Sequence, residues 1–176
     1  WESLEEIENV ISYIDILISK SNDTIKNQKS SKSDEKIKKG SILKPIGPHL
    51  ILGSFIDPCL INSSKIITAL LTGNSIIFKP SEKACYSGEL LTDCLIKAGF
   101  PKGVINLIQG DVEIGRRLSL NKAVKGIFLT GSIESGKKII QGTHNDLRKV
   151  VNLELGGKNT TIICEDADIK NALTET

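Results

Sequence analysis

Short apolar strands alternate with helical segments between residues 50 and 154, and this rhythm limits the fold more than any other sequence feature. The expected strands are 50–52, 75–79, 104–108, 126–130 and 150–154, and the expected helices between them are 57–71, 83–98, 111–120 and 132–141. Such alternation is typical of βαβ units, which form a parallel sheet. We therefore predict an α/β fold with a Rossmann-like parallel sheet and helices on both faces.

The two ends of the chain add further elements to this prediction. Residues 1–20 have apolar side chains at helical spacing, and residues 21–39 are almost entirely polar. We therefore expect an N-terminal helix and polar linker over 1–40, followed by a nucleotide-binding domain over 41–176. A sixth strand is expected at 160–163, Asp57 is expected to cap the helix at 57–71, and Asp168 is expected to cap a final helix. The chain starts without methionine and stops soon after that last helix begins, so the domain is expected to be incomplete at its C-terminus.

The composition excludes several classes of protein. With 39% hydrophobic residues, 25% charged residues and a net charge of +2, the chain is typical of a globular protein. The lysines are scattered and aromatic residues make up only 4%, so we expect no nucleic-acid interface. The four cysteines form no CxxC pair and lie far from both histidines, which argues against a metal site or disulfide framework. Free thiols and the lack of a long apolar run predict a cytoplasmic protein without a membrane span.

A glycine turn joins the strand at 126–130 to the next helix. Gly131 breaks the apolar run, and Ser132 stands where a helix cap belongs. The free N–H groups and the dipole of a helix N-terminus attract a phosphate. A plain strand-to-helix turn is the alternative. Residues 131–137 also spell G-x-x-x-x-G-K, the pattern of a P-loop, with 162–166 as a strand ending in a metal-binding acid. However, Lys138 stands where a P-loop needs Ser or Thr, which weighs against a triphosphatase.

A second motif, Phe-Lys-Pro-Ser-Glu, directly follows the strand at 75–79. Lys79 and Glu82 could hold the hydroxyl groups of a ribose. A carboxylate binds a 2′-hydroxyl and repels a 2′-phosphate, which favours NAD over NADP. The alternative is an exposed turn in which Ser81 caps the following helix.

A third motif places Glu154 at the end of an apolar strand, before two glycines. Apolar surroundings raise the pKa of a carboxyl group and suit it to general base catalysis. The alternative is a bulge or turn with an incidental acid.

Together, the sequences FKPSE, GIFLTGS and LELGGKN, in this order at three strand ends, resemble the aldehyde dehydrogenase superfamily. The resemblance covers the whole chain. It is strongest to the branch that acts on N-succinylglutamate semialdehyde, through PIGPHLILGSF, ALLTGNSIIFKPSE and AGFPKGVINLIQG. It implies NAD-dependent (less readily NADP-dependent) oxidation of an aldehyde to a carboxylic acid, in arginine catabolism, by a homo-oligomer. In this family a cysteine thiolate attacks the aldehyde, and hydride then passes to NAD.

The resemblance also implies roles for individual residues. The adenosine ribose would be held by Lys79, Ser81 and Glu82. The pyrophosphate would lie on the loop Gly131, Ser132, Ile133, Glu134, Ser135 and Gly136. Phe128 and Thr130 would line the approach to the nicotinamide, and Glu154 would be the base that activates water.

Two departures from the family pattern put activity in doubt. The family's nucleophilic cysteine lies beyond the segment that this chain covers. Ile56, within Ser54–Pro58, also occupies the position of an asparagine whose side-chain amide helps to form the oxyanion hole. Loss of one oxyanion donor typically costs about two to three orders of magnitude in rate. We therefore expect no turnover by this chain alone, and a non-catalytic remnant or a nucleotide-binding or assembly subunit is the alternative.

Overall fold

The computed structural model describes residues 2–25, 28–29, 40–157 and 159–175. Its main sheet contains five parallel strands in the order β5-β4-β3-β6-β7, which confirms the predicted α/β fold. The strands are β3 (His49–Leu52), β4 (Ile76–Lys79), β5 (Ile105–Leu107), β6 (Gly126–Gly131) and β7 (Val150–Leu155). A separate antiparallel pair joins β1 (Gln28–Lys29) to β2 (Gly40–Ser41). Most of the predicted linker, at 26–27 and 30–39, lies outside the described residues.

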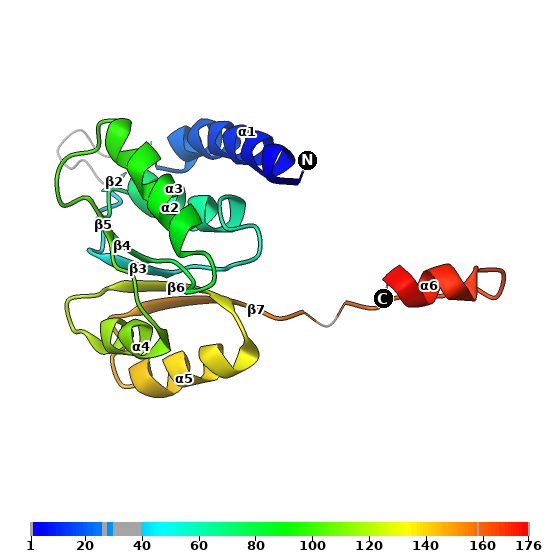
Figure 1. Cartoon of the computed structure of the whole chain (residues 1–176). Helices are drawn as coiled ribbons and strands as arrows, with labels where there is room; N and C mark the ends of the chain where they lie inside the picture. The colour runs from blue at the N-terminus through cyan, green and yellow to red at the C-terminus, as the bar shows by residue number, and fades with distance from the viewer. Residues whose placement is uncertain (1, 26–27, 30–39, 158, 176) are drawn as a thin grey trace.

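Helices cover both faces of the sheet, as predicted (Figure 1). On one face lie α1 (Glu2–Thr24), α2 (Leu60–Leu71) and α3 (Cys85–Lys97), and on the other lie α4 (Val112–Leu120) and α5 (Ile133–Thr143). The alternation of side chains along β3 supplies both cores. Leu50 and Leu52 pack with Ile139 of α5, whereas Ile51 packs with Ile66 of α2. No described helix combines the length and hydropathy needed to cross a membrane.

The order of the strands determines where a ligand can bind. The chain moves outward from β3 through β4 to β5, then returns to the other side of β3 to form β6 and β7. The direction of winding therefore reverses between β3 and β6. In open parallel sheets, ligands bind outside the carboxyl ends of the strands at such a switch point.

The predicted cap of α2 is wrong. Helix α2 begins at Leu60, and Asp57 has a left-handed φ of 42° in the preceding turn. The acceptor comes instead from α1, because Oε1 of Glu6 accepts hydrogen bonds from the N–H groups of Cys59 (2.7 Å) and Leu60 (2.9 Å). This contact joins segments more than fifty residues apart, so local sequence patterns did not reveal it.

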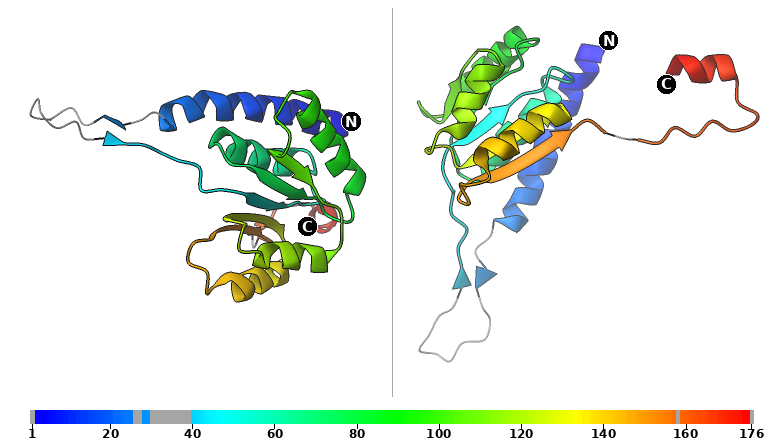
Figure 2. Two further views of the ribbon diagram at one scale, coloured as in Figure 1. Left: turned by 90° about the vertical axis from the view of Figure 1, so that its left-hand side faces the viewer. Right: turned by 90° about the horizontal axis from the view of Figure 1, so that it is seen from below.

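The predicted strand at 160–163 is also wrong, whereas the predicted cap of the last helix is confirmed. The structure assigns no strand in 159–175, and this segment runs away from the sheet toward α6 (Ile169–Glu175) (Figure 2). Ile162 is 82% exposed, and strand backbone needs a neighbouring strand for its hydrogen bonds. Asp168 accepts from the N–H groups of Lys170 (2.9 Å) and Asn171 (3.2 Å).

The Glu6 contact yields a first prediction. Replacing Glu6 with Ala is expected to lower the free energy of unfolding by about 1 kcal/mol, because the first turn of α2 loses its acceptor. Urea unfolding followed by circular dichroism would measure this loss. Glu8→Ala is the control, since Glu8 is exposed on the same helix. Equal losses in the two variants would contradict the capping role.

Candidate functional site

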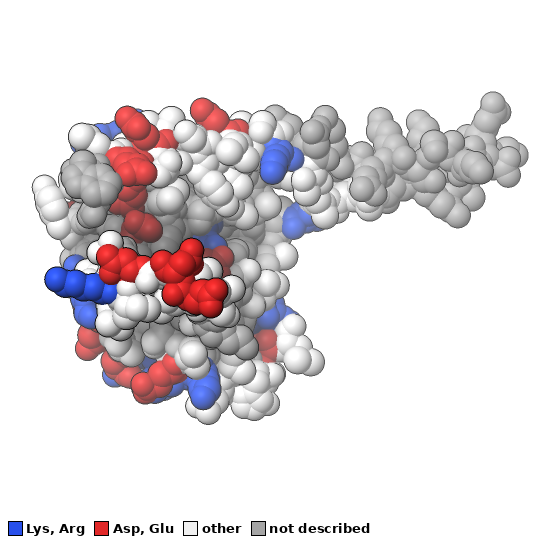
Figure 3. All heavy atoms as spheres, turned by 90° about the vertical axis from the view of Figure 1, so that its right-hand side faces the viewer, with Lys and Arg blue, Asp and Glu red and all other residues white. Residues whose placement is uncertain are grey.

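A cavity of about 530 Å³ opens at the carboxyl edge of the sheet, where the switch point lies. Its walls include the ends of β3, β4, β6 and β7 together with residues of α4 and α5. Figure 3 looks onto this edge of the molecule, where acidic side chains form a group near the centre and basic side chains lie scattered around it. Three groups predicted from separate motifs meet here, namely Lys79 with Glu82, Gly131 with Ser132, and Glu154.

The turn after β6 has the geometry of an anion site. Ser132 is the N-cap of α5, and its Oγ accepts from the N–H group of Ser135 at 3.1 Å. Gly131, Ser132 and Ser135 all line the cavity, so the N-terminal end of the α5 dipole faces it. The predicted strand and serine cap are confirmed, but the predicted glycine turn is wrong, because Gly131 is the last residue of β6 and pairs with Leu155 of β7.

The other residues of the predicted pyrophosphate loop, 133–136, form the first turn of α5. Ile133 and Glu134 are exposed and lie outside the lining formed by the described residues. Gly136 is buried, and a Cβ atom there would lie 2.6 Å from Cδ1 of Leu155. Its lack of a side chain allows α5 to pack closely against β7.

Lys79 and Glu82 form a pair on the wall of the cavity. Lys79 is 5% exposed, and its Nζ donates to the carbonyl of Pro80 at 3.0 Å. Oε2 of Glu82 lies 4.0 Å from the same Nζ. Ser81 also lines the cavity, and its Oγ accepts from the N–H group of Lys83 at 3.3 Å. The local bond of Ser81 forms a turn, but Ser81 does not cap the next helix, because α3 begins at Cys85 and its N-cap residue is Ala84. The wall of the cavity brings a cation, Lys79, and a carboxylate, Glu82, together.

Glu154 lies at the end of β7, opposite Thr130 of β6. Its carboxylate pairs with Nζ of Lys65 from α2 and accepts from Oγ1 of Thr130 at 3.4 Å. The Glu154 side chain is 51% exposed, so the expectation of apolar surroundings is wrong. The sequence analysis did not identify Lys65. It is the one charged residue of α2, and a lone charge on an apolar helix could have indicated a polar partner elsewhere in the fold.

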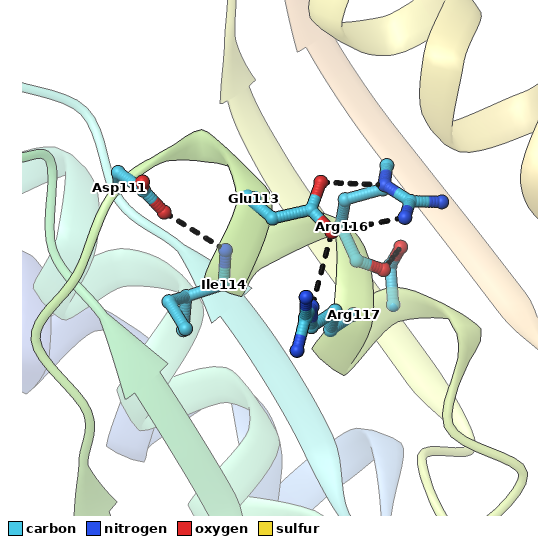
Figure 4. Close-up of polar contacts among 6 residues, drawn as sticks. Asp111, Glu113, Ile114, Arg116 and Arg117 are labelled. Carbon is cyan, nitrogen blue, oxygen red and sulfur yellow. Dashed lines mark hydrogen bonds and ion pairs between the residues drawn. The ribbon is translucent and has the colours of Figure 1, made fainter.

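Sequence reasoning also missed two cations of the lining, Arg116 and Lys138. The guanidinium of Arg116 makes two bonds to Glu113, from Nε at 2.8 Å and from Nη2 at 2.9 Å (Figure 4). Nε of Arg117 donates to the same carboxylate at 3.0 Å. The spacing of these residues along α4 could have predicted the ion pairs, since residues three and four apart are neighbours on the surface of a helix.

The bonds from Arg116 and Arg117 lower the pKa of Glu113 to about 2. A depressed carboxyl pKa stabilises the fold above the unfolded-state value of 4.5, and that contribution disappears as the pH falls toward 2. The effect on stability is expected to be small because Glu113 is exposed. NMR titration of the Glu113 carboxyl should therefore give a midpoint near 2. In Arg116→Gln/Arg117→Gln the midpoint should rise toward 4.5, and a midpoint near 4.5 in the unchanged chain would contradict the geometry.

Phe128 lies away from the cavity. Its ring packs against the core beneath α2 and α3 and stacks on His49, with centroids 5.7 Å apart. Among the described residues it is not part of the lining, whereas Thr130 is. The expected position beside a nicotinamide therefore has geometric support for Thr130 alone.

The chemical groups of an aldehyde-oxidising site are sparse here. Ile56 lines the cavity and is 59% exposed, and its side chain offers no hydrogen-bond donor. In the described part of the chain, no cysteine contributes to the lining. Burial, followed by the charge of Glu6, raises the pKa of the Cys59 thiol, which makes it less reactive.

The P-loop alternative does not fit this geometry. Residues 133–137 are already helical, whereas a P-loop wraps around the phosphates before its helix begins. Lys137 lies outside the lining that the described residues form, and the acids at 165–166 follow a segment that leaves the sheet.

Comparisons with known proteins agree with these features. A family model described as "Aldehyde dehydrogenase family" matches residues 1–176. An N-succinylglutamate 5-semialdehyde dehydrogenase of Legionella pneumophila is 34% identical over the whole chain, which spans 35% of that relative. A betaine aldehyde dehydrogenase of Staphylococcus aureus, solved with NAD+, is 31% identical with a TM-score of 0.84, over 98% of this chain and 35% of its own. PnpE from Pseudomonas sp. WBC-3, solved with nicotinamide adenine dinucleotide, is 33% identical with a TM-score of 0.73, over 86% and 31%. The chain thus spans about a third of these relatives.

Proposed function

This chain belongs to the aldehyde dehydrogenase family, and we propose that its cavity binds NAD as the electron acceptor in the oxidation of an aldehyde to a carboxylic acid. The observation that carries this proposal is the convergence of the α5 N-terminus, the Lys79–Glu82 pair and Glu154 on one cavity. The two NAD complexes among the similar structures support it.

Each part of the cavity suits one part of the dinucleotide. The N–H groups at Ser132 and Ser135 would hold the pyrophosphate, because helix N-termini attract anions. Lys79 and Glu82 would bind the hydroxyls of the adenosine ribose. Thr130 would contact the nicotinamide side, whereas Ile133, Glu134 and Gly136 shape α5. When bound, NAD would supply a hydride acceptor.

We propose that Glu154 acts on water beside that acceptor. Its carboxylate faces the cavity between Lys65 and Thr130. An ionised carboxylate is the form that accepts a proton from water. Both contacts also hold the side chain in one orientation, as a base needs.

The names of the curated relatives suggest N-succinylglutamate semialdehyde as the substrate. Because these relatives are 31–34% identical to this chain, we propose this aldehyde as the first to be tested. We propose that this reaction belongs to arginine catabolism. We propose a homo-oligomer in the cytoplasm, where the four free cysteines would stay reduced.

A second candidate is a nucleotide-binding subunit without catalytic activity, and Ile56 favours it. The N-terminus of α5 lines the cavity, whereas Ile56, at the position that the resemblance gives to an oxyanion donor, carries an apolar side chain. A carbonyl oxygen that gains charge there would lack one donor, which typically costs about two to three orders of magnitude in rate. We propose that the 176-residue polypeptide alone binds NAD but oxidises no aldehyde.

Calorimetry and an absorbance assay together test these proposals. NAD should bind the 176-residue chain, with magnesium and ATP failing to compete. Incubation with NAD and succinylglutamate semialdehyde should then produce no NADH. NADH formation would overturn the proposed inactivity, and a folded chain that ignores millimolar NAD would overturn the proposed binding.

A further inference from the structure

One buried amide closes the loop that joins β3 to α2. Asn62 lies in the first turn of α2 and is 2% exposed. Its Oδ1 accepts a hydrogen bond from the N–H group of Ser54 at 3.0 Å. Its Nδ2 donates to the carbonyl of Ser54 at 3.3 Å and to the carbonyl of Pro58 at 2.7 Å. The Asn62 side chain therefore ties together the two ends of the segment Ser54–Pro58, which we call the β3–α2 loop.

The β3–α2 loop forms part of the cavity wall. Ser54, Phe55 and Ile56 all contribute to the lining. Phe55 and Ile56 are 51% and 59% exposed, so burial of these two side chains does little to fix the loop. The position of this part of the wall therefore depends on polar contacts, and the bonds to Asn62 reach both ends of the loop.

The backbone of the β3–α2 loop also needs support from its surroundings. Asp57 has a left-handed φ of 42°, a region that residues with a side chain seldom occupy. Such a conformation persists where surrounding contacts hold it in place. Nζ of Lys83 lies 4.7 Å from the centre of the Phe55 ring, but both of these side chains are exposed. The contact of Asn62 is buried, so solvent competes with it less.

The surroundings of Asn62 favour an amide over a carboxylate. A Cβ atom at Gly53, directly before the loop, would lie 2.9 Å from Oδ1 of Asn62, so the side chain fits closely. Its Nδ2 has two hydrogens and two carbonyl acceptors. An aspartate has the same shape, but its ionised carboxylate has only acceptors. It would place negative charge against the carbonyls of Ser54 and Pro58 and release the loop.

We infer that Asn62 is a positioning residue for the cavity, which holds Phe55 and Ile56 in the wall and thereby sets the affinity for NAD. This inference rests on the proposed function. A loop that leaves its position lowers the fraction of molecules whose cavity is ready to bind, and the apparent affinity falls by that fraction. A loop in position in about one molecule in ten would weaken NAD binding about tenfold.

Calorimetric titration of NAD against Asn62 variants tests this role. Asn62→Asp keeps the shape of the side chain and loses the two donated bonds, so it should weaken NAD binding about tenfold. Asn62→Ala removes the amide without adding a charge and should weaken binding by a similar factor. Thermal unfolding shows which variants are folded, and Asn62→Ala provides the test if Asn62→Asp does not fold.

Asn74 offers a matched control at the opposite edge of the sheet. It is also buried, and its Oδ1 accepts from the N–H groups of Ile46 at 2.9 Å and Gly47 at 3.1 Å. Its Nδ2 donates to the carbonyl of Ala69 at 3.3 Å. Asn74 lines a separate cavity beside the amino ends of β3 and β4. Asn74→Asp should therefore destabilise the fold as Asn62→Asp does, but leave the NAD affinity within twofold.

A mutant cycle shows whether Asn62 acts through the β3–α2 loop. In a Phe55→Ala/Ile56→Ala background, the wall lacks the two side chains that Asn62 positions. Asn62→Asp should therefore weaken NAD binding less than twofold in that background, because the effects of coupled residues are not additive. A purely structural role would give the same loss in both backgrounds.

The outcomes separate the role of Asn62 from the proposed function. NAD affinities within twofold of the unchanged chain in the folded Asn62 variants overturn the role while NAD binding stands. An equal loss in Asn74→Asp, or the full tenfold loss in the Phe55→Ala/Ile56→Ala background, also overturns it. If the unchanged chain binds no NAD, the dinucleotide site and the role of Asn62 in it are both wrong.

Discussion

Replacing Gly131 with Asp is expected to weaken NAD binding by about a hundredfold or more. Gly131 lies in the cavity wall directly before the α5 cap, where the pyrophosphate is proposed to lie. Two like charges about 4 Å apart repel by about 4 kcal/mol at an effective dielectric constant of 20, and salt lowers this figure. The fold should survive, because a Cβ atom at Gly131 would come no closer than 3.5 Å to a neighbouring side chain, that of Leu129.

Gly131→Ala separates charge from bulk in this experiment. It adds one methyl group and should change the NAD affinity less than about fivefold. Calorimetry gives the affinities, and thermal unfolding shows whether each variant is folded. If a folded Gly131→Asp chain had the same NAD affinity as Gly131→Ala, the pyrophosphate would not bind at this turn.

Replacing Gly126 with Ala is expected to lower the free energy of unfolding by about 2–3 kcal/mol. A Cβ atom there would lie 2.2 Å from Cδ2 and 2.4 Å from Nε2 of the His49 ring. That ring cannot easily move, because it is 6% exposed, stacks on Phe128 and has Nδ1 2.9 Å from the carbonyl of Gly47. The clash would strain the pairing of β3 with β6, where His49 lies opposite Gly126.

A double-mutant cycle tests the source of this loss. In a His49→Ala background the added methyl group finds space, so Gly126→Ala should cost less than about 1 kcal/mol there. Urea unfolding measures all four chains. An equal cost in the two backgrounds would mean that strain elsewhere, and not the His49 ring, makes glycine necessary at this position.

The sheet could be predicted from the sequence because its signals are local. Each strand from His49–Leu52 to Val150–Leu155 is a short apolar run between turn residues, and each helix between them has its own periodicity. The failures involve contacts between distant segments. Glu6 replaces Asp57 as the acceptor at α2, and residues 160–163 remain unpaired although their composition suits a strand.

The candidate site also contains residues that local motifs predicted and residues that only the fold reveals. The α5 cap at Ser132 and the turn at Lys79–Glu82 follow from motifs within a few residues, and the structure brings them to one cavity. Lys65 could not be assigned to Glu154 because 89 residues separate them, and only the fold places α2 beside the end of β7. In the sequence, Arg116 and Lys138 resemble other charged residues on helices. Only the fold shows that they lie on the sides of α4 and α5 that face the cavity.

The α5 cap and Ile56 lead to different conclusions about the same cavity. The first supports binding of an anion, and the second removes a donor from the place where an aldehyde would react. If the chain binds NAD but oxidises no aldehyde, as we propose, an assay of turnover alone would not test the dinucleotide site.

NMR chemical-shift mapping with NAD tests the central claim most directly. As NAD is added to the labelled chain, the amide signals of residues that line the proposed site should shift, namely those of Lys79, Ser81, Glu82, Gly131, Ser132 and Ser135. Asn74 and Phe100 belong to a separate cavity lined by residues that include Pro45, Leu70 and Val104, and their signals should stay in place. Shifts confined to that second cavity, or no shifts at millimolar NAD in a folded chain, would contradict a dinucleotide site at the carboxyl edge of the sheet.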